Sequence, residues 1–149
     1  MTDPSTDAAA GRPTGYAGDL TPREAYDLLT HDPAAVLVDV RTEAEWTFVG
    51  VPQLPGRGPL LVSWAPRPGE VPGTEFLAEL ARQGVRPGPD PVVFLCRSGK
   101  RSVAAATAAT AAGYTAAQNV LDGFEGDLDA SGHRGGAGWR AEGLPWRQS

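Results

Sequence analysis

Cysteine and histidine are scarce in this chain: its 149 residues include one cysteine, Cys96, and two histidines. A single cysteine forms no intramolecular disulfide bond and builds no cysteine-rich metal centre. His31 and His133 lie far apart in polar stretches, and a zinc site needs about four ligands, so we expect no metal. The glycine cluster at 135–138 follows no predicted strand and forms no nucleotide-binding loop, and we expect no cofactor.

Long apolar runs and an excess of positive charge are also missing. The Ala-rich run from Val103 to Ala112 is shorter than the roughly 18 residues that a membrane span needs. The first residues, Met1 to Asp7, include acids and lack the basic and apolar regions of a signal peptide. The net charge of -5 argues against binding to nucleic acid or to an anionic membrane. We therefore expect a cytoplasmic protein with no membrane and no nucleic-acid partner.

The chain alternates between predicted strands and predicted helices. Short, largely apolar runs predict strands at 35–40, 60–62 and 92–95, and Asn119-Val120-Leu121 is predicted to form the last strand. Capping boxes at 21–24 and 42–45 begin two helices; further helices are expected from Thr74, from Ser102 to Ala112 and around Trp139, with a loop at 50–59. This alternation predicts an α/β fold with an open, mostly parallel sheet and helices on both faces. We expect residues 1–15 to form a flexible tail and residues 16–149 to form one domain.

Cys96 directly follows the strand predicted at 92–95, and a helix is predicted just beyond it. Ligands of open parallel sheets bind outside the carboxyl ends of the strands, so Cys96 is placed where a site is expected. Loop amides and a helix N-terminus form a cradle for an anion, and Arg97, Lys100 and Arg101 add three positive charges. Together these features favour the thiolate, which is the nucleophilic form of cysteine. The pattern predicts a reactive cysteine.

The same residues also have a plainer interpretation. A lone cysteine is often a small buried apolar residue. Each cation taken singly is an ordinary solvated charge, Ser98 is an ordinary turn residue, and Ser102 is expected to be a helix N-cap. The clustering of three cations in an acidic chain favours the reactive interpretation, since a buried structural cysteine has no need of cations beside it.

Three motifs of this sequence resemble the single-domain members of the rhodanese family, over roughly residues 16–147. They are the loop Cys96-Arg97-Ser98-Gly99-Lys100-Arg101-Ser102, the run Leu37-Val38-Asp39-Val40-Arg41 with Glu45-Trp46, and Asn119-Val120-Leu121-Asp122-Gly123-Phe124 with Trp139 and Gly143-Leu144-Pro145. The motifs occur in the family's order and at plausible separations, which makes the resemblance specific.

The resemblance implies a parallel sheet of five strands and a sulfurtransferase activity. Cys96 would take a sulfane sulfur from a small anionic donor such as thiosulfate and hold it as a persulfide. The sulfur would pass to a thiol or another thiophilic acceptor, and whether a protein serves as acceptor stays open. The resemblance makes Arg97, Ser98, Gly99, Lys100, Arg101 and Ser102 the substrate-binding residues, and it makes Asp39 and Arg41 supports of the fold.

The sequence departs from the family pattern at two places. Family members commonly have Gly-His-Ile-Pro-Gly-Ala after the short helix, whereas this chain has Gly50-Val51-Pro52-Gln53-Leu54 and lacks the histidine. The segment 127–138 resembles an insertion, for which a flap over the site and an inconsequential solvent loop are both open.

Two other functions fit the same fold. A cysteine phosphatase or arsenate reductase needs an arginine six residues after the cysteine, but Ser102 stands there and Arg101 comes one residue earlier. The loop therefore suits a sulfur atom better than a phosphate group. A non-catalytic binding or regulatory module is expected to lose the cysteine or its cations, and this chain keeps both. The sequence thus favours the sulfurtransferase.

Overall fold

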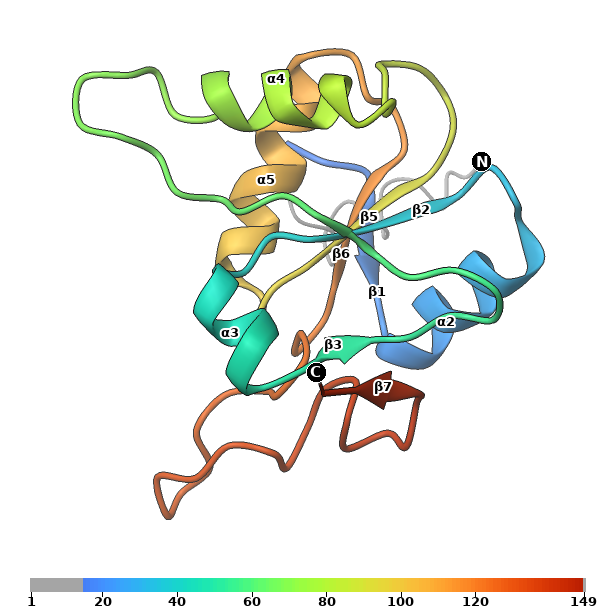
Figure 1. Cartoon of the computed structure of the whole chain (residues 1–149), viewed down its shortest axis with the longest axis vertical. Helices are drawn as coiled ribbons and strands as arrows, with labels where there is room; N and C mark the ends of the chain where they lie inside the picture. The colour runs from blue at the N-terminus through green and yellow to red at the C-terminus, as the bar shows by residue number, and fades with distance from the viewer. Residues whose placement is uncertain (1–14, 149) are drawn as a thin grey trace, which may run out of the picture.

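The computed structural model describes residues 15–148, so the predicted tail lies, apart from Gly15, outside the described residues. Five strands form one parallel sheet in the order β1-β6-β5-β2-β4 (Figure 1). They are β1 (Gly18–Leu20), β2 (Val36–Asp39), β4 (Leu60–Leu61), β5 (Val92–Leu95) and β6 (Ala117–Val120). The strands β3 (Val51–Pro52) and β7 (Trp146–Arg147) form a separate antiparallel pair.

The helices are α2 (Pro22–His31), α3 (Glu43–Phe48), α4 (Thr74–Arg82) and α5 (Lys100–Ala111). Within residues 15–148, no helix has the length and apolar character needed to cross a membrane.

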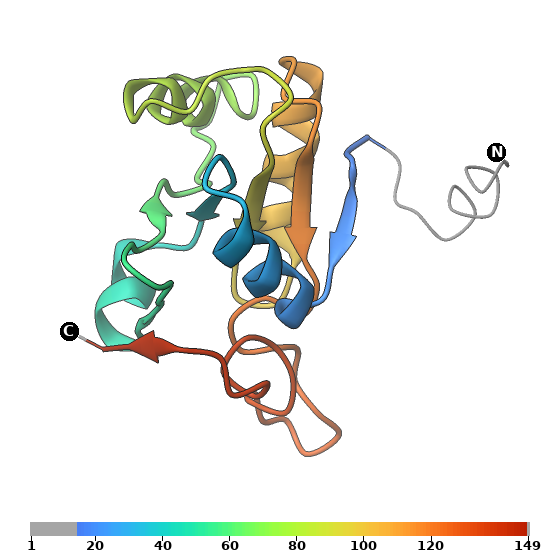
Figure 2. The same ribbon diagram turned by 90° about the vertical axis from the view of Figure 1, so that its right-hand side faces the viewer.

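Helices cover both faces of the sheet, as the sequence predicts. Along β5 the side chains alternate: Val92 and Phe94 belong to the core under α4 and α5, whereas Val93 and Leu95 belong to the core under α2. Figure 2 shows α2 and α5 on opposite sides of the sheet. Because this strand is buried on both faces, its sequence is continuously apolar, which is typical of a parallel sheet. The predicted α/β fold is confirmed.

Both predicted capping boxes are formed. Thr21 Oγ1 accepts a hydrogen bond from the Glu24 amide at 3.1 Å, and Glu24 Oε1 accepts one from the Thr21 amide at 2.9 Å. Thr42 and Glu45 form the same reciprocal pair at the start of α3. Each box satisfies amides that a helix start leaves without partners. The second box begins α3 soon after β2 ends, which brings Glu45 to the carboxyl end of the sheet.

Two helices begin differently from the prediction. Gly73, not Thr74, is the N-cap of α4, and Gly99 is the N-cap of α5. Both glycines have positive φ, 98° and 115°, a backbone conformation that glycine adopts without steric cost. Helix α5 consequently begins at Lys100, and the predicted N-cap Ser102 lies inside its first turn.

Three further segments differ from the prediction. Strand β1 was not predicted, because it has only three residues and Leu20 is the one large apolar residue among them. The loop predicted at 50–59 contains β3. The helix predicted around Trp139 is a series of turns, since Gly138 and Gly143 both have positive φ and interrupt helical geometry there.

After β6 the chain turns back against the loop that follows β5. The Phe124 amide donates to the Cys96 carbonyl at 2.8 Å, and the Glu125 amide donates to the Arg97 carbonyl at 3.0 Å. Gly123 has φ 57° at this contact. A Cβ atom on Gly123 would overlap the Cys96 carbonyl oxygen and would lie 2.6 Å from the Arg97 carbonyl carbon. Glycine is therefore required here, and the contact holds the backbone of Cys96 in place.

The segment 127–138 extends away from the sheet, and Figure 1 shows it as the orange-red loop at the lower left. Residues 127–133 are all exposed. The base of the loop is held by two hydrogen bonds of 2.8 Å, from Arg134 Nη1 to the Gly126 carbonyl and from the Gly135 amide to the Glu125 carbonyl. This placement favours the solvent-loop interpretation over a flap that covers Cys96.

We expect the substitution Gly123→Ala to lower the free energy of unfolding by about 3 kcal/mol, because it adds backbone strain and an overlap with the Cys96 peptide. Gly56→Ala is the matched control: Gly56 also has positive φ, 72°, but no atom lies within 4 Å of its added Cβ. The control should cost about 1 kcal/mol, the strain alone. Urea unfolding of the two variants measures the difference, and equal losses would refute the close contact.

Candidate functional site

Cys96 is the first residue beyond β5 and lies at the carboxyl end of the sheet. Its Sγ accepts a hydrogen bond from the Gly99 amide at 3.1 Å and lies 3.2 Å from Ser102 Oγ. The residue is only 1% exposed and packs in the core under α4 and α5. The structure thus places Cys96 where the sequence predicts it, but the thiol is buried rather than open to solvent.

Helix α5 begins beside the sulfur. Its N-cap, Gly99, has no side chain that could accept hydrogen bonds from the amides of the first turn. The amides and the dipole at a helix N-terminus favour negative charge nearby. The Gly99 amide and the start of α5 therefore place hydrogen-bond donors and the positive end of a helix dipole beside Sγ.

The three predicted cations are not equivalent. The Arg101 guanidinium binds both carboxylate oxygens of Glu45, at 2.7 and 3.0 Å. These two side chains are 28% and 17% exposed, so the ion pair is largely shielded. Arg97 and Lys100 are exposed, and neither forms an ion pair with any residue between 15 and 148. Two of the three positive charges therefore remain uncompensated beside Cys96.

The ion pair changes the titration of both partners. Burial alone would raise the pKa of the Glu45 carboxyl, but hydrogen bonds from Arg101 and Thr42 outweigh burial and lower the pKa from 4.5 to about 2. The hydrogen bonds to Glu45 raise the pKa of the Arg101 guanidinium against the opposing effect of its burial. The pair stays ionised at neutral pH and joins α3 to α5 across the loop.

A chain of polar side chains leads from the sulfur into the sheet. Ser102 Oγ donates to Asn119 Oδ1 at 2.6 Å, and Asn119 Nδ2 donates to Asp19 Oδ1 at 2.9 Å. The Tyr16 hydroxyl donates to the same Asp19 oxygen at 2.8 Å. Burial, with smaller effects from the Asp19 hydrogen bond and charge, raises the pKa of the Tyr16 phenol well above its usual range. Residues of α5, β6 and β1 are thereby connected to Cys96.

Asp39 and Arg41 form a buried ion pair at the end of β2. Arg41 Nε and Nη2 donate to Asp39 at 3.0 and 2.7 Å, and both side chains are 0% exposed. Arg41 Nη2 also donates to the Gly50 carbonyl at 2.7 Å, and its guanidinium lies 4.4 Å from the centre of the Phe124 ring. These contacts fit the structural role that the family resemblance implies for both residues.

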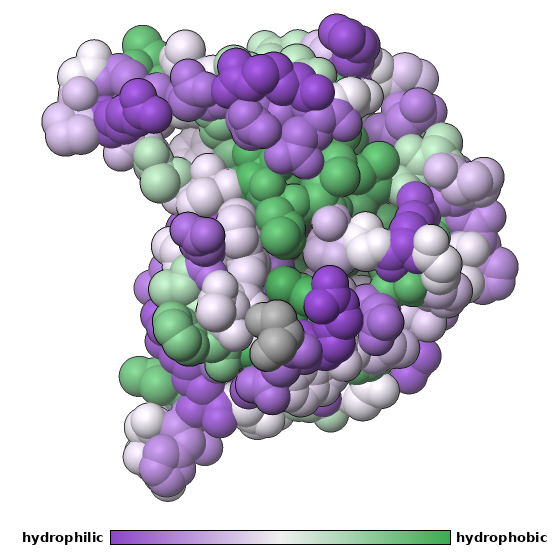
Figure 3. Space-filling view, in the orientation of Figure 1, coloured by the Kyte–Doolittle hydropathy of each residue, from purple (hydrophilic) through white to green (hydrophobic). Residues whose placement is uncertain are grey.

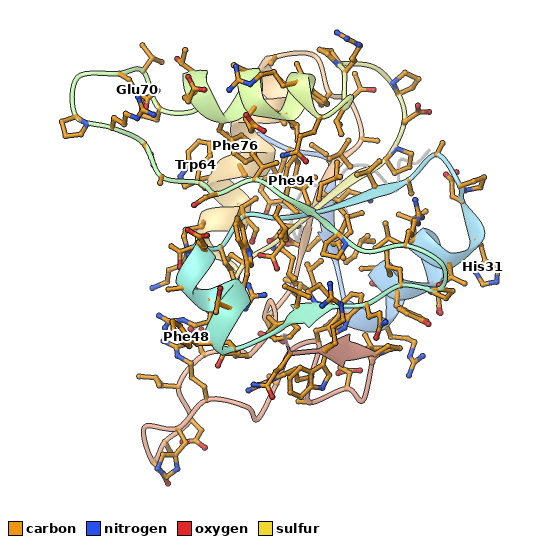
Figure 4. The ribbon with its side chains drawn as sticks, viewed as in Figure 1. His31, Phe48, Trp64, Glu70, Phe76 and Phe94 are labelled. Carbon is orange, nitrogen blue, oxygen red and sulfur yellow. The ribbon has the colours of Figure 1, made fainter. Side chains whose placement is uncertain are left out.

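Two cavities lined by residues between 15 and 148 lie away from the cysteine loop. One of about 380 Å³ lies between residues 61–67 and α4, where Figure 3 shows apolar surface beneath the polar surface of the helix. Trp64 and Phe76 pack there edge to face with ring centres 5.2 Å apart (Figure 4). A second cavity of about 300 Å³ lies beside α3 and residues 58–61. No residue of 96–102 lines either of these two cavities. The candidate site is therefore assigned from the contacts of the Cys96 sulfur.

The two histidines lie apart on the surface. His31 and His133 are both exposed, and Figure 4 shows His31 at the edge of the molecule. The described residues contain no group of three or more histidine, cysteine, aspartate or glutamate side chains that could hold a metal ion.

Several residues near the sulfur were not among the predicted site residues. Asn119 is 2% exposed yet polar, and a polar side chain within the strand predicted at 119–121 was the available signal of a buried hydrogen bond. Glu45 gave no such signal, because its contact with Arg101 joins residues 56 positions apart. Gly123 belongs to the third motif, but its close approach to Cys96 depends on the folded backbone.

We expect the ion pair of Glu45 to make the fold sensitive to acid. The Glu45 pKa is lower in the folded chain, about 2, than its ordinary value of 4.5, so the pair stabilises the fold above pH 4.5 and this contribution disappears as the pH falls toward 2. The free-energy difference between the wild type and Glu45→Gln in urea unfolding should shrink over that interval. Glu43→Gln, on the same helix and exposed, is the control, and a pH-independent difference for Glu45→Gln would contradict the assignment.

Comparison with known proteins identifies the family. The Rhodanese-like domain family matches residues 21–130. An uncharacterized protein of Rickettsia rickettsii is 35% identical over 125 residues, which are 83% of this chain and 92% of that protein. The crystal structure of Rv0390 from M. tuberculosis has 60% identity and a TM-score of 0.78, covering 90% of this chain and 99% of that chain. The polysulfide-sulfur transferase homodimer of Wolinella succinogenes has a similar fold, with a TM-score of 0.65 at 24% identity, covering 97% of this chain and 89% of that chain. The chain therefore belongs to the rhodanese-like domain family.

Proposed function

We propose that this protein is a sulfurtransferase that carries a sulfane sulfur on Cys96. The observation that carries this proposal is the environment of Sγ: the Gly99 amide donates to it at 3.1 Å at the start of α5. Amides at a helix N-terminus stabilise negative charge on the sulfur and on a persulfide that replaces it. Arg97 and Lys100 supply uncompensated positive charge in the same loop, which suits an anionic donor.

The reaction has two steps. The Cys96 thiolate attacks the outer sulfur of thiosulfate, a bond forms between the two sulfurs, and the original sulfur–sulfur bond breaks with sulfite leaving as the electron-pair acceptor. An acceptor thiolate then attacks the terminal sulfur of the persulfide, which restores the Cys96 thiolate. Each step transfers one neutral sulfur atom and consumes no cofactor.

The buried position of Cys96 suits a persulfide carrier. A persulfide is lost to water and to stray thiols when it is exposed, and a site that excludes water prevents such side reactions. The residue is 1% exposed, and the contacts of Gly123 and Phe124 hold its backbone. A donor of few atoms is therefore favoured over a bulky one. Because thiol acceptors are maintained in reducing compartments, we place the activity in the cytoplasm.

The loop disfavours a phosphatase. Such an enzyme needs an arginine at position 102 to bind the phosphate oxygens, and the structure has Ser102 there, with its hydroxyl directed to Asn119. Arg101 precedes that position and is already bound to Glu45 at both carboxylate oxygens. No cation of α5 is thus free in the position that a phosphate ester requires.

We expect Cys96 to gain one sulfur atom when the protein is incubated with thiosulfate or with polysulfide. Intact mass spectrometry detects the added sulfur, and treatment with a thiol should remove it. Cys96→Ser is the matched control and should show no addition, because it removes the sole thiol of the chain. Wild-type protein that stays unmodified by both donors would leave the non-catalytic binding module as the function.

We expect Lys100→Gln and Arg97→Gln each to slow persulfide formation from thiosulfate about fivefold at low ionic strength, since each removes one exposed charge near the sulfur. Added salt should reduce the difference. Arg86→Gln is the control, because Arg86 is also exposed but precedes β5 and so lies at the opposite end of the sheet. A stopped-flow series over salt concentration measures the rates, and an equal loss in the control would remove the electrostatic argument.

A further inference from the structure

The hydrogen bonds that link Ser102, Asn119, Asp19 and Tyr16 have donors and acceptors that can be assigned from the chemistry of these side chains. Asp19 Oδ1 accepts hydrogen bonds from Asn119 at 2.9 Å and from the Tyr16 hydroxyl at 2.8 Å. An ionised carboxylate only accepts hydrogen bonds, whereas an asparagine amide has a donor end and an acceptor end. The NH₂ end of Asn119 must therefore point to Asp19, and its oxygen must point the other way.

That orientation determines the hydrogen bond of Ser102. Asn119 is 2% exposed, and its oxygen lies 2.6 Å from Ser102 Oγ. A serine hydroxyl has one proton to donate, so Ser102 gives it to Asn119. Toward Cys96 Sγ, 3.2 Å away, Ser102 then presents only lone pairs. The neutral thiol fits this arrangement, because its S–H can donate to Ser102 while Sγ accepts from the Gly99 amide.

We propose that Asn119, oriented by Asp19, is a positioning residue that directs the Ser102 hydroxyl away from the sulfur in the resting protein and so favours the thiol. When the thiol proton leaves to a base in solution, the hydroxyl must rotate to donate to the thiolate. The same rotation is needed when Sγ carries a second sulfur, since it then has no proton to offer. Rotation of the Ser102 hydroxyl breaks its hydrogen bond to Asn119 and leaves the buried Asn119 Oδ1 without a donor. This cost opposes ionisation of the Cys96 thiol.

This inference rests on the proposed function only in taking Cys96 as the reacting thiol. It makes Asn119 a regulator of the proportion of thiolate at a given pH. The charged residues on the elements around the sulfur stay the same when Asn119 is replaced; they are Arg97, Lys100 and Arg101 of the loop and α5, Glu45 of α3, Asp39 and Arg41 beside β2, Asp19 of β1, and Asp122 and Glu125 after β6. A change in the thiol titration then reports on the hydrogen bonds of Ser102.

The test is a titration of the thiolate by its ultraviolet absorbance, with the signal of Cys96→Ser subtracted. Asn119→Leu frees the Ser102 hydroxyl to donate to the sulfur in both states, so we expect about tenfold more thiolate at a given pH, a midpoint about one pH unit lower. In a Ser102→Ala background, Asn119→Leu should leave the titration midpoint unchanged, because the hydroxyl that Asn119 orients is then missing. An unchanged midpoint for Asn119→Leu, or an equal shift in both backgrounds, would overturn the proposal.

Two further variants keep the test decisive. Tyr16→Phe removes the outer hydrogen bond to Asp19 but leaves the Asn119 orientation intact, so its midpoint should match the wild type. If Asn119→Leu does not fold, Asn119→Ala removes the same amide with a smaller side chain. The titration uses no sulfur donor, so its result is independent of persulfide formation. If Asn119→Leu shifts the midpoint of the Cys96 titration but the wild type forms no persulfide, only the proposed sulfurtransferase function is refuted. If the wild type forms a persulfide but the midpoint does not shift, only the role of Asn119 is refuted.

Discussion

The arrangement around Cys96 depends on the buried ion pair between the Arg41 guanidinium and Asp39. The guanidinium binds Asp39 at the end of β2, the Gly50 carbonyl after α3, and the face of Phe124 after β6. The Phe124 segment contacts the cysteine loop directly through the hydrogen bond from the Phe124 amide to the Cys96 carbonyl, and Arg41 joins that segment to the other two. Loss of Arg41 would leave the Asp39 carboxylate buried and unpaired, which costs several kcal/mol. The pair therefore supports the site from behind without touching the sulfur.

Rigidity of the loop follows from backbone contacts rather than from its side chains. The carbonyls of Cys96 and Arg97 accept amides of the segment after β6, and Gly123 permits the two backbones to approach. On the opposite side, the Glu45–Arg101 pair connects α3 with the first turn of α5. The sulfur is thus held between two segments that are distant in sequence. Such preorganisation is what an electrostatic cradle needs, because its dipoles then require no reorganisation during the reaction.

Much of the fold could be predicted from sequence, because the relevant signals are local. Strands β2, β4 and β5 lie in largely apolar runs, and the capping boxes at Thr21 and Thr42 depend on residues three positions apart. The start of α5 was predicted wrongly for a physical reason. Serine is a favoured N-cap, but Gly99 adopts positive φ and takes that position, so Ser102 is turned toward Cys96 and Asn119. A local rule could not show which of the two residues would begin the helix.

The features that sequence could not predict join distant parts of the chain. β1 pairs with β6 through Gly18 and Gln118, and β3 pairs with β7 through Val51 and Arg147. Neither pairing can form on the ribosome until the later residue has emerged, so β1 stays unpaired until Gln118 has been made and released from the ribosome. Contacts of such sequence separation slow folding, because the loop must close before the contact is made. The hydrogen bond between Asn119 and Asp19 spans 100 positions, and the environment of Cys96 is therefore completed only after β6 has emerged, although Asp19 has been made much earlier.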